Sequence, residues 1–271
     1  MSKAIIFSTL GLFLFFQCSP VPVSGRRQLN LIPQSQMLAL SFQSYDQFLS
    51  ENQVIKGTPE AEMVSTVGRR IQKAVEQYFS ARNEQKLIEG FQWEFNLIKD
   101  SSVNAFAMPG GKTAVLTGIL PVTRNATGLA VVLGHEIAHA VARHGNERMS
   151  QLLLAQLGGM ALSEALSEQP QLTRELALIA FGVGTQVGVL LPYSRIQESE
   201  ADRLGLIFMA MAGYDPREAV EFWERMDNQG GPTVPEFLST HPSTENRIQD
   251  IKRLIPEAMK YYRGEIQGKT N

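Results

Sequence analysis

Two histidines four residues apart, with a glutamate directly after the first, are the residues of this sequence best suited to chemistry. The segment from His135 to His139 has the sequence HEIAH, which fits the pattern H-E-x-x-H. On a helix, residues four apart share a face, so both imidazoles can bind one metal ion. Glu136 lies about 100° round the helix from His135 and can reach a water molecule instead of the ion. The pattern predicts a zinc clamp with a general base, and its alternative is a pair of ordinary helix histidines.

A catalytic zinc ion has three protein ligands and one open position, so a third ligand must come from elsewhere in the chain. An acidic segment from Glu198 to Asp202 offers the candidates. Glu198 and Asp202 are four apart on one helix face, whereas Glu200 points about 200° away from Glu198. We expect Glu198 to bind the metal and Asp202 to accept the N–H of a ligand imidazole. The alternative is a solvated acidic helix face.

Composition limits what else the chain could be. It has 271 residues, of which 44% are hydrophobic, and a formal net charge of −2, which is ordinary for a globular protein with a buried core. No basic stripe with interleaved aromatic residues follows the chain, so we expect no nucleic acid partner. Cys18 is the only cysteine, which excludes an intrachain disulfide and a metal site made of cysteines.

The elements that must position these residues suggest an α+β fold that is mainly helical. Apolar residues recur at helical spacing over 38–49 and over 64–79. Alternation over 91–99 predicts a strand, and the apolar runs of 105–120 around a Pro-Gly-Gly turn predict a hairpin. The sheet is expected to be small and antiparallel.

A helix is predicted from Thr127, read as its cap, to a stop near Gly145, and this helix carries the HEIAH segment. Helices follow to the C-terminus. The apolar stretch Leu176 to Leu191 contains glycines and polar residues and is too short to span a bilayer, so we interpret it as a buried helix.

The N-terminus has the pattern of an export signal. Lys3 precedes an apolar run from Ala4 to Phe16. Cys18 follows directly where a bacterial lipoprotein signal places its acylated residue, although Gln17 departs from the small residue that usually precedes it. The organisation that we predict is a signal peptide (1–17), a tether with a candidate lipidation site at Cys18 (18–28), a zinc metallopeptidase domain (29–262) and a polar tail (263–271).

Three ordered motifs together resemble one known family. They are GHEIAH at Gly134–His139, SR followed by ESEADR at Ser194–Arg203, and STHP before NRI at Ser239–Ile248. The chain is similar to the HtpX-like gluzincin metallopeptidases, which include the CaaX prenyl endopeptidases and the BepA and LoiP envelope proteases. The likeness runs from about Gly25 to Leu254 and is greatest to short, lipoprotein-like envelope members, which also have a Gly-Arg-Arg segment after the signal.

This resemblance implies roles for further residues. It supports Glu198 as the zinc ligand and brings His241 to the metal, where this histidine could stabilise an oxyanion or fill the open zinc position; the sequence leaves both roles open. Arg247 could assist the oxyanion or form a salt bridge to Glu245 or Asp250. His144 points off the ligand face and is interpreted as a packing or surface residue.

Asn104, Ala105 and Phe106 resemble the edge strand on which such peptidases bind substrate. An edge strand has unpaired N–H and C=O groups, so an extended peptide can pair with it almost regardless of its side chains. The alternative is an ordinary strand whose asparagine caps a turn.

These observations predict a zinc-dependent endopeptidase with one zinc per chain, which acts on unfolded or misassembled polypeptides. We expect it to be exported to a bacterial cell envelope, facing the periplasm, with membrane attachment if Cys18 is acylated. Its oligomeric state is not encoded in any pattern. The main alternative is a zinc-stabilised, chaperone-like binding module in which His241 is a permanent fourth ligand. A zinc hydrolase that acts on another carbonyl is a third possibility.

Overall fold

The chain adopts a mainly helical α+β fold, as predicted. The computed structural model describes residues 18–167, 171, 194–228, 235–241 and 246–263. The helices are α2 (Gln34–Glu51), α3 (Pro59–Ser80), α4 (Leu120–Thr123), α5 (Ala126–Val141), α6 (His144–Ala165), α8 (Arg195–Met211), α9 (Glu218–Asp227), α10 (Glu236–Thr240), α11 (Arg247–Ala258) and the short 3-10 helices η1 (Gln85–Ile88) and η2 (Thr117–Ile119). The strands are β1 (Cys18–Pro20), β2 (Arg27–Leu29), β3 (Val54–Ile55), β4 (Glu94–Ile98), β5 (Ala105–Met108) and β6 (Lys112–Leu116).

Four strands form one sheet in the order β3-β4-β6-β5. The predicted hairpin is present as antiparallel β5 and β6, but β4 runs parallel to β6, so the sheet is mixed instead of antiparallel. The difference arises because β6 lies between β4 and β5, which follow each other in the chain. This order leaves β5 at an edge, beside α5.

Helices α5 and α8 form the centre of the fold. Almost every residue of α5 is buried, as expected for a helix that is apolar on all sides. The helix begins at the cap Asn125, whose side chain accepts from the N–H groups of Thr127 and Gly128; Thr127, read from the sequence as the cap, is inside the helix. It ends at Val141, before Gly145, because Arg143 has a left-handed backbone (φ 60°).

Two glycines allow α5 and α8 to approach closely. A Cβ atom on Gly134 would lie 2.8 Å from the carbonyl oxygen of Gly205, and a Cβ on Gly205 would lie 2.8 Å from the backbone nitrogen of His135. Such distances are far below a normal contact between backbone atoms. The glycine pair therefore sets the separation of the two helices that carry the metal-site motifs.

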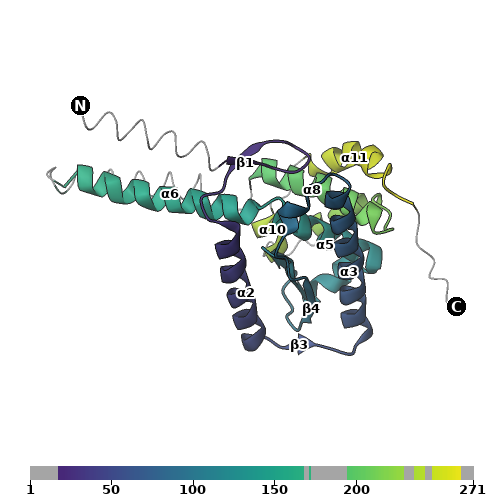
Figure 1. The fold of residues 1–271 in the computed structure, drawn as a ribbon. Coiled ribbons are helices and arrows are strands. Elements are labelled where there is room, and N and C mark those ends of the chain that lie inside the picture. Colours follow the sequence, from purple (N-terminus) through teal and green to yellow (C-terminus); the bar gives the residue numbers. More distant parts are fainter. Residues whose placement is uncertain (1–17, 168–170, 172–193, 229–234, 242–245, 264–271) are drawn as a thin grey trace.

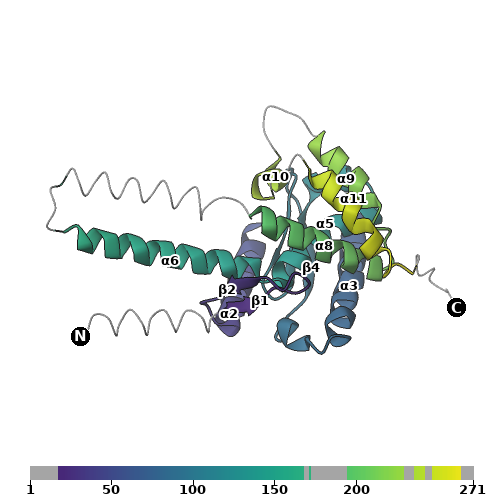
Figure 2. The same cartoon turned by 90° about the horizontal axis from the view of Figure 1, so that it is seen from above.

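The other helices cover this centre. Helices α2 and α3 stand on either side of the strands (Figure 1), and α3 packs on β4, α5 and α8. Helix α11 packs on α8, and α9 packs on α5 and α11 (Figure 2). The large side chains at the centre of the core, all less than 2% exposed, include Trp223, Phe79, Phe208, Phe222 and Phe237.

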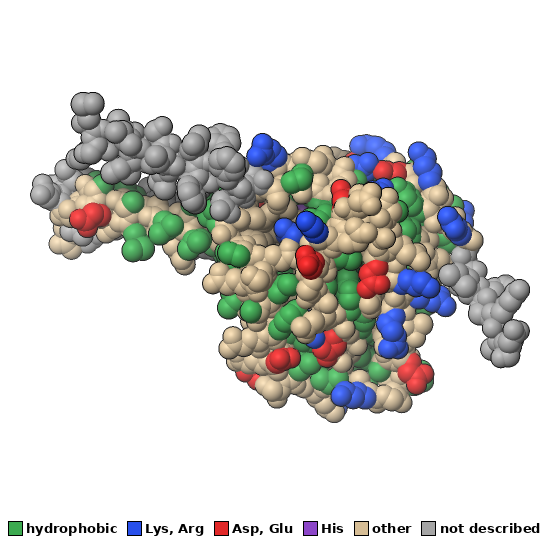
Figure 3. All heavy atoms as spheres, in the orientation of Figure 1, with side chains coloured by type: hydrophobic (Ala, Val, Ile, Leu, Met, Phe, Trp, Pro, Cys, Tyr) green, Lys and Arg blue, Asp and Glu red, His purple; other side chains and the backbone are tan. Residues whose placement is uncertain are grey.

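Helix α6 projects from the body in both ribbon views (Figures 1 and 2). Its outer part exposes Met149, Leu153, Leu154, Leu157 and Met160, and apolar side chains are visible along it in Figure 3. Its first turn is buried and includes His144 and Glu147. The buried residues of this helix lie in its first two turns: His144, Asn146, Glu147 and Ser150.

Residues 18–29 form a hairpin, although the sequence predicted a tether for 18–28. Strands β1 and β2 are antiparallel, with Ser19 opposite Gln28. The Gln28 side chain is buried and donates a hydrogen bond of 2.7 Å to the carbonyl oxygen of Ala142. Composition suggested a linker because the segment has no apolar period, but its order comes from contacts with distant residues.

Three predicted segments fall outside the described residues: the signal peptide at 1–17, the apolar stretch Leu176 to Leu191, and the polar tail at 263–271 apart from its first residue. Of the helices that the structure does describe, none combines the length and the apolar character needed to cross a bilayer.

Candidate metal centre and active site

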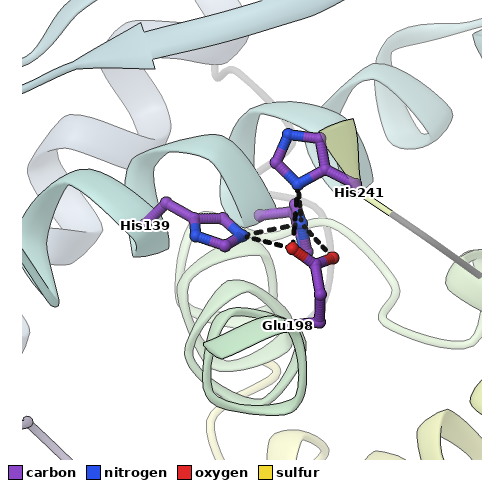
Figure 4. Close-up of side chains that lie close together, drawn as sticks. His139, Glu198 and His241 are labelled. Atoms are coloured by element: carbon purple, nitrogen blue, oxygen red, sulfur yellow. Dashed lines mark hydrogen bonds and ion pairs between the residues drawn. The ribbon is translucent and has the colours of Figure 1, made fainter. Parts of the chain in front are cut away.

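Four side chains meet at the crossing of α5 and α8. His135 and His139 come from α5, Glu198 from the first turn of α8, and His241 from the residue that ends α10. Figure 4 shows His139, Glu198 and His241 pointing toward one another. All four residues are at most 3% exposed. The structure thus brings together the three predicted ligands and the histidine that the family resemblance added.

The spacing of the four donor atoms suits a tetrahedral metal ion. The Nε2 atoms of His135 and His139 are 3.1 Å apart, and Nδ1 of His241 lies 3.2 Å from Nε2 of His135 and 3.1 Å from Oε1 of Glu198. Oε1 of Glu198 is 3.3 Å from Nε2 of His139. Ligands about 2.0–2.1 Å from an ion at the corners of a tetrahedron are about 3.3–3.4 Å apart. The four atoms could therefore hold one ion.

Buried oxygens without hydrogen bonds point to the same conclusion. Oε2 of Glu198 and Oε1 of Glu136 are buried and form no hydrogen bond among the described residues. Oε2 of Glu198 does lie 3.2 Å from Arg247 and Oε1 of Glu136 3.3 Å from His241, but a buried carboxylate oxygen that lacks a well-aligned hydrogen bond is costly. A cation at the donor cluster would satisfy the first oxygen, and a water molecule beside it would satisfy the second.

The ionisation states of the donor residues suit a bound cation. Burial alone would raise the pKa of Glu198, but His135 and His139 outweigh it and hold this pKa far below its usual range. Burial keeps the pKa of His139 well below its usual value, so this imidazole is neutral, as a metal-binding histidine must be. Burial also lowers the pKa of His135, but Glu198 and Asp202 raise it more, to about 9. A metal ion replacing the His135 proton would release that proton on binding.

Asp202 and Arg247 lie behind His135. Nδ1 of His135 is 2.9 Å from Oδ1 of Asp202, and Arg247 donates to both oxygens of Asp202 at 2.8 and 3.0 Å while its guanidinium covers the Trp223 ring. Burial would raise the pKa of Asp202, but Arg247 and His135 lower it below the usual value. The carboxylate is thus ionised and accepts the His135 N–H.

The partners of Arg247 differ from those suggested by the sequence. Asp250 forms its salt bridge with Arg253 instead, and Glu245 is outside the described residues. Arg247 also lies 3.2 Å from Oε2 of Glu198. The sequence offered a salt bridge to Glu245 or Asp250 as one of two open possibilities; the structure pairs Arg247 with Glu198 and Asp202 of α8 and does not test Glu245.

Glu136 lies between the donor cluster and the edge strand. Its Oε1 is 3.3 Å from Nε2 of His241, and its carboxylate accepts a hydrogen bond from the backbone N–H of Ala107 on β5. Burial raises the pKa of Glu136 against the lowering effect of His241 and His135. A carboxylate with a raised pKa is suited to take and return a proton.

Strand β5 lies at the edge of the sheet next to this carboxylate. The N–H of Ala105 donates to the Asn104 side chain at 2.9 Å and the N–H of Ala107 donates to Glu136, so a peptide that pairs with β5 would replace these contacts. The carbonyl oxygen of Asn104 accepts from the N–H of Leu116 on β6. Pairing alternates along an antiparallel ladder, so the backbone groups of Ala105 and Ala107 point away from β6. Phe106 lies on the same strand and contacts Phe48 edge to face. Asn104, Ala105 and Phe106 thus begin an edge strand, and the sequence missed Ala107, whose role depends on the tertiary contact with Glu136.

Sequence reasoning also missed His144 and Glu200. His144 is fully buried, and its Nδ1 lies 3.0 Å from Nδ1 of His139; it is not a surface residue. Glu200 is 3.1 Å from the other nitrogen of His144. Burial would raise the pKa of Glu200, but hydrogen bonds from His144, Arg26 and Ser24 lower it to about 2. The left-handed turn at Arg143 carries His144 back toward His139, and a helical-wheel argument could not include this turn.

Comparisons with known proteins agree with this geometry. Residues 66–255 match peptidase family M48. The chain is 31% identical over 268 residues to the mitochondrial metalloendopeptidase OMA1 of Saccharomyces cerevisiae, with 96% of this chain and 75% of that protein covered. It is 35% identical over 253 residues to OMA1 of Schizosaccharomyces pombe, covering 92% and 69%. The beta-barrel assembly-enhancing protease of Yersinia pestis is 29% identical over 168 residues, 59% of this chain and 34% of that protein. The family match includes all four donor residues.

Proposed function

This chain belongs to peptidase family M48, and from this membership we propose that it is a zinc-dependent endopeptidase acting on unfolded or misassembled polypeptides. The membership confirms the resemblance to HtpX-like gluzincins, and the family makes the chain a metalloendopeptidase. The observation that carries the proposal is the cluster of His135, His139, Glu198 and His241, with Glu136 beside it on the same helix as two of the donors.

The proposed metal ligands are His135, His139 and Glu198, with one zinc ion per chain. Two imidazoles and a carboxylate are a common ligand set for catalytic zinc. When bound, the metal would polarise a peptide carbonyl and lower the pKa of a water molecule. Glu136 would take a proton from that water at Oε1, which forms no hydrogen bond among the described residues, and return it to the leaving amine. Asp202 and Arg247 would keep His135 oriented with its N–H on Nδ1.

His241 has a more specific proposed role. Its Nδ1 lies where a fourth metal ligand would be, at 3.1–3.2 Å from donor atoms of Glu198 and His135. A site with four protein ligands has no position open for a water molecule. We therefore propose that His241 blocks the metal in the arrangement described and leaves it when substrate binds. Once displaced, its Nε2 side could stabilise the oxyanion of the reaction.

The substrate is proposed to bind as an extra strand along β5. The backbone groups of Ala105 and Ala107 face away from β6, and Ala107 already contacts Glu136. A peptide paired with Ala105 would have its backbone next to the donor cluster, because β5 packs on α5. Recognition through backbone groups makes few demands on side chains. Broad specificity, as protein quality control requires, is the expected result.

The biological setting is also part of the proposal. The yeast relatives are named as mitochondrial metalloendopeptidases and the Yersinia relative as a beta-barrel assembly-enhancing protease. The apolar run before Cys18 and the position of that cysteine support export to a bacterial envelope and attachment through a lipid. We propose that the peptidase acts there, facing the periplasm, with residues 1–17 as the signal and the domain after them.

Hydrolysis of casein tests the proposal. The full chain should cleave casein in the presence of zinc, and a chelator should abolish the cleavage. Glu136→Gln should retain about one zinc per chain but lose hydrolysis by a factor of about a hundred or more. Glu221→Gln, which makes the same change on an exposed glutamate of α9, is the matched control and should cleave like the parent. Cleavage retained in Glu136→Gln would refute its role as the base.

His241→Ala separates the two roles of this histidine. If His241 blocks the metal, the variant should cleave casein faster than the parent while binding zinc less tightly, because it loses one ligand. A slower variant with unchanged zinc affinity would instead identify His241 as an oxyanion-stabilising residue.

A zinc-stabilised binding module remains a second candidate, because four protein donors surround one point. The base Glu136 beside the donors favours the peptidase, since a structural site needs no base. Zinc binding without cleavage by the parent or His241→Ala, together with suppression of casein aggregation, would favour the binding module.

A further inference from the structure

A chain of buried hydrogen bonds leads from His139 to the N-terminal hairpin. With Nε2 of His139 in the donor cluster, its Nδ1 carries the proton and donates to Nδ1 of His144 at 3.0 Å. Nε2 of His144 then carries a proton and donates to Oε2 of Glu200 at 3.1 Å. A single arrangement of protons satisfies both bonds. His144 is fully buried and Glu200 is 7% exposed, so water does not substitute readily for either partner.

Arg26 completes this chain from the other side. Its Nε and Nη2 atoms donate to the two oxygens of Glu200, each at 3.0 Å. The same guanidinium donates to the two oxygens of Glu147 at 2.6 and 2.8 Å. Gln197 holds Glu147 with a hydrogen bond of 2.7 Å. Bidentate pairing fixes the geometry of the partners as well as neutralising their charge. One arginine therefore holds a carboxylate of α8 next to a carboxylate of α6.

His135 and His139 are each oriented by a carboxylate that an arginine holds in place. His135 donates directly to Asp202, and Arg247 holds Asp202. His139 donates through His144 to Glu200, and Arg26 holds Glu200. Both carboxylates belong to α8, but the two arginines differ in origin: Arg247 begins α11, whereas Arg26 belongs to the segment that precedes the whole peptidase domain.

The conformation of the hairpin loop places the Arg26 side chain against Glu200. The N–H of Val21 donates to the carbonyl oxygen of Arg26 at 2.8 Å, and the N–H of Gly25 donates to the carbonyl oxygen of Val21. Val23 has a φ of 71°, a conformation that a β-branched residue adopts only when its surroundings impose it. Ser24 also donates to Glu200. A simple linker would not need a strained loop closed on a buried carboxylate.

We propose that Arg26 is a positioning residue of the metal centre, which acts through Glu200 and His144 to hold His139 in its metal-binding orientation. The inference rests on the metal site of the proposed function. It makes the hairpin of residues 18–29 part of the support of that site. It also predicts that displacing the hairpin lowers the affinity for zinc, because His139 is then held less firmly in its metal-binding orientation.

The test measures zinc affinity of the full chain by competition with a chromophoric chelator, for the parent, Arg26→Met, His144→Leu and the double variant. Partners of metal-binding histidines typically contribute roughly ten- to a hundredfold to affinity, so His144→Leu should lie in that range. Arg26→Met acts from further away and should weaken binding by roughly three- to tenfold. Because both act through one path, the double variant should bind as His144→Leu does.

Arg27→Met is the matched control, since it removes the same charge one residue along, from an exposed side chain of β2. It should keep the parent's zinc affinity. Thermal unfolding with and without metal separates positioning from folding: Arg26→Met removes the ion pairs to Glu147 and Glu200 and should lower the metal-free unfolding temperature, but it should lower the zinc-bound one by more.

Several results would overturn the proposal. Unchanged zinc affinity in Arg26→Met, an equal loss in Arg27→Met, or fold-changes that multiply in the double variant would each do so. The Arg26 side chain is 26% exposed, so the pair Arg26→Met and Arg27→Met decides the matter even if His144→Leu fails to fold. A parent that binds no zinc would instead refute the proposed metal site itself.

Discussion

Replacing Gly205 by alanine should separate the two helices that carry the metal site. The new Cβ would lie 2.8 Å from the backbone nitrogen of His135 and 2.9 Å from the carbonyl carbon of Gly134. Comfortable separations are about 3.5 Å or more, and backbone atoms inside a helix cannot rotate away. Helices α5 and α8 must therefore part by roughly half an ångström, which displaces Glu198 from the two histidines.

The magnitude follows from this displacement. Forcing an extra methyl group into a packed core costs about 1–3 kcal/mol, which for a chain of this size lowers the unfolding temperature by about 2–12 °C. Since a misplacement of about 1 Å costs roughly a hundredfold in rate, half of it should lower casein hydrolysis by about tenfold. Circular dichroism during heating measures the first effect, and hydrolysis at saturating zinc measures the second.

Gly145→Ala provides the control in the first turn of α6. The nearest atom to its new Cβ would be Cγ of Pro109 at 3.9 Å, an ordinary contact, and alanine favours a helix over glycine by up to about 1 kcal/mol. Gly145→Ala should therefore be as stable as the parent or slightly more stable. If Gly205→Ala unfolds and cleaves like Gly145→Ala, the glycine contact does not set the helix separation and the reasoning fails.

Three further changes test other parts of the structure. Asp202→Asn should weaken zinc binding by roughly tenfold in a chelator competition, because His135 loses its charged acceptor; unchanged affinity would contradict this. Asn125→Ala removes the cap of α5 and should lower the free energy of unfolding by about 1 kcal/mol in urea, so an unchanged midpoint would count against the cap. Tyr45→Phe leaves the carbonyl oxygen of Thr113, now bonded at 2.7 Å, without its buried donor and should cost about 1–2 kcal/mol in the same assay, with cleavage unaffected.

The parts of the fold that depend on local rules were predictable. The helical period over residues 38–49 and 64–79 predicted α2 and α3, and the turn at Gly110 and Gly111 predicted the hairpin, because both glycines adopt positive φ angles. The order of the sheet was not predictable, since the insertion of β6 between β4 and β5 leaves no trace in a periodic pattern. The hairpin of residues 18–29 was also missed, because its order comes from contacts with distant residues and not from a periodic pattern in its own sequence.

The features of the site likewise fall into two groups: those that follow from the helix period and those that depend on contacts between distant parts of the chain. The sequence by itself determined which residues of α5 could form a metal clamp, because His135, Glu136 and His139 occupy one helical turn and their relative directions follow from the helix period. The same period placed Glu198 and Asp202 on one face of α8, and both side chains do lie beside His135; their roles as ligand and supporting carboxylate stay predictions.

Only the tertiary structure decided how His139 is held and what surrounds Arg247. Arg26 and Glu200 are 174 residues apart, and His144 reaches His139 because of one left-handed residue, Arg143. Hydrogen bonds between such distant groups depend on helix crossings, and these in turn depend on close contacts such as that of Gly134 with Gly205. Local periodicity determines which way a side chain points from its own helix, but only the packing of helices determines what it meets.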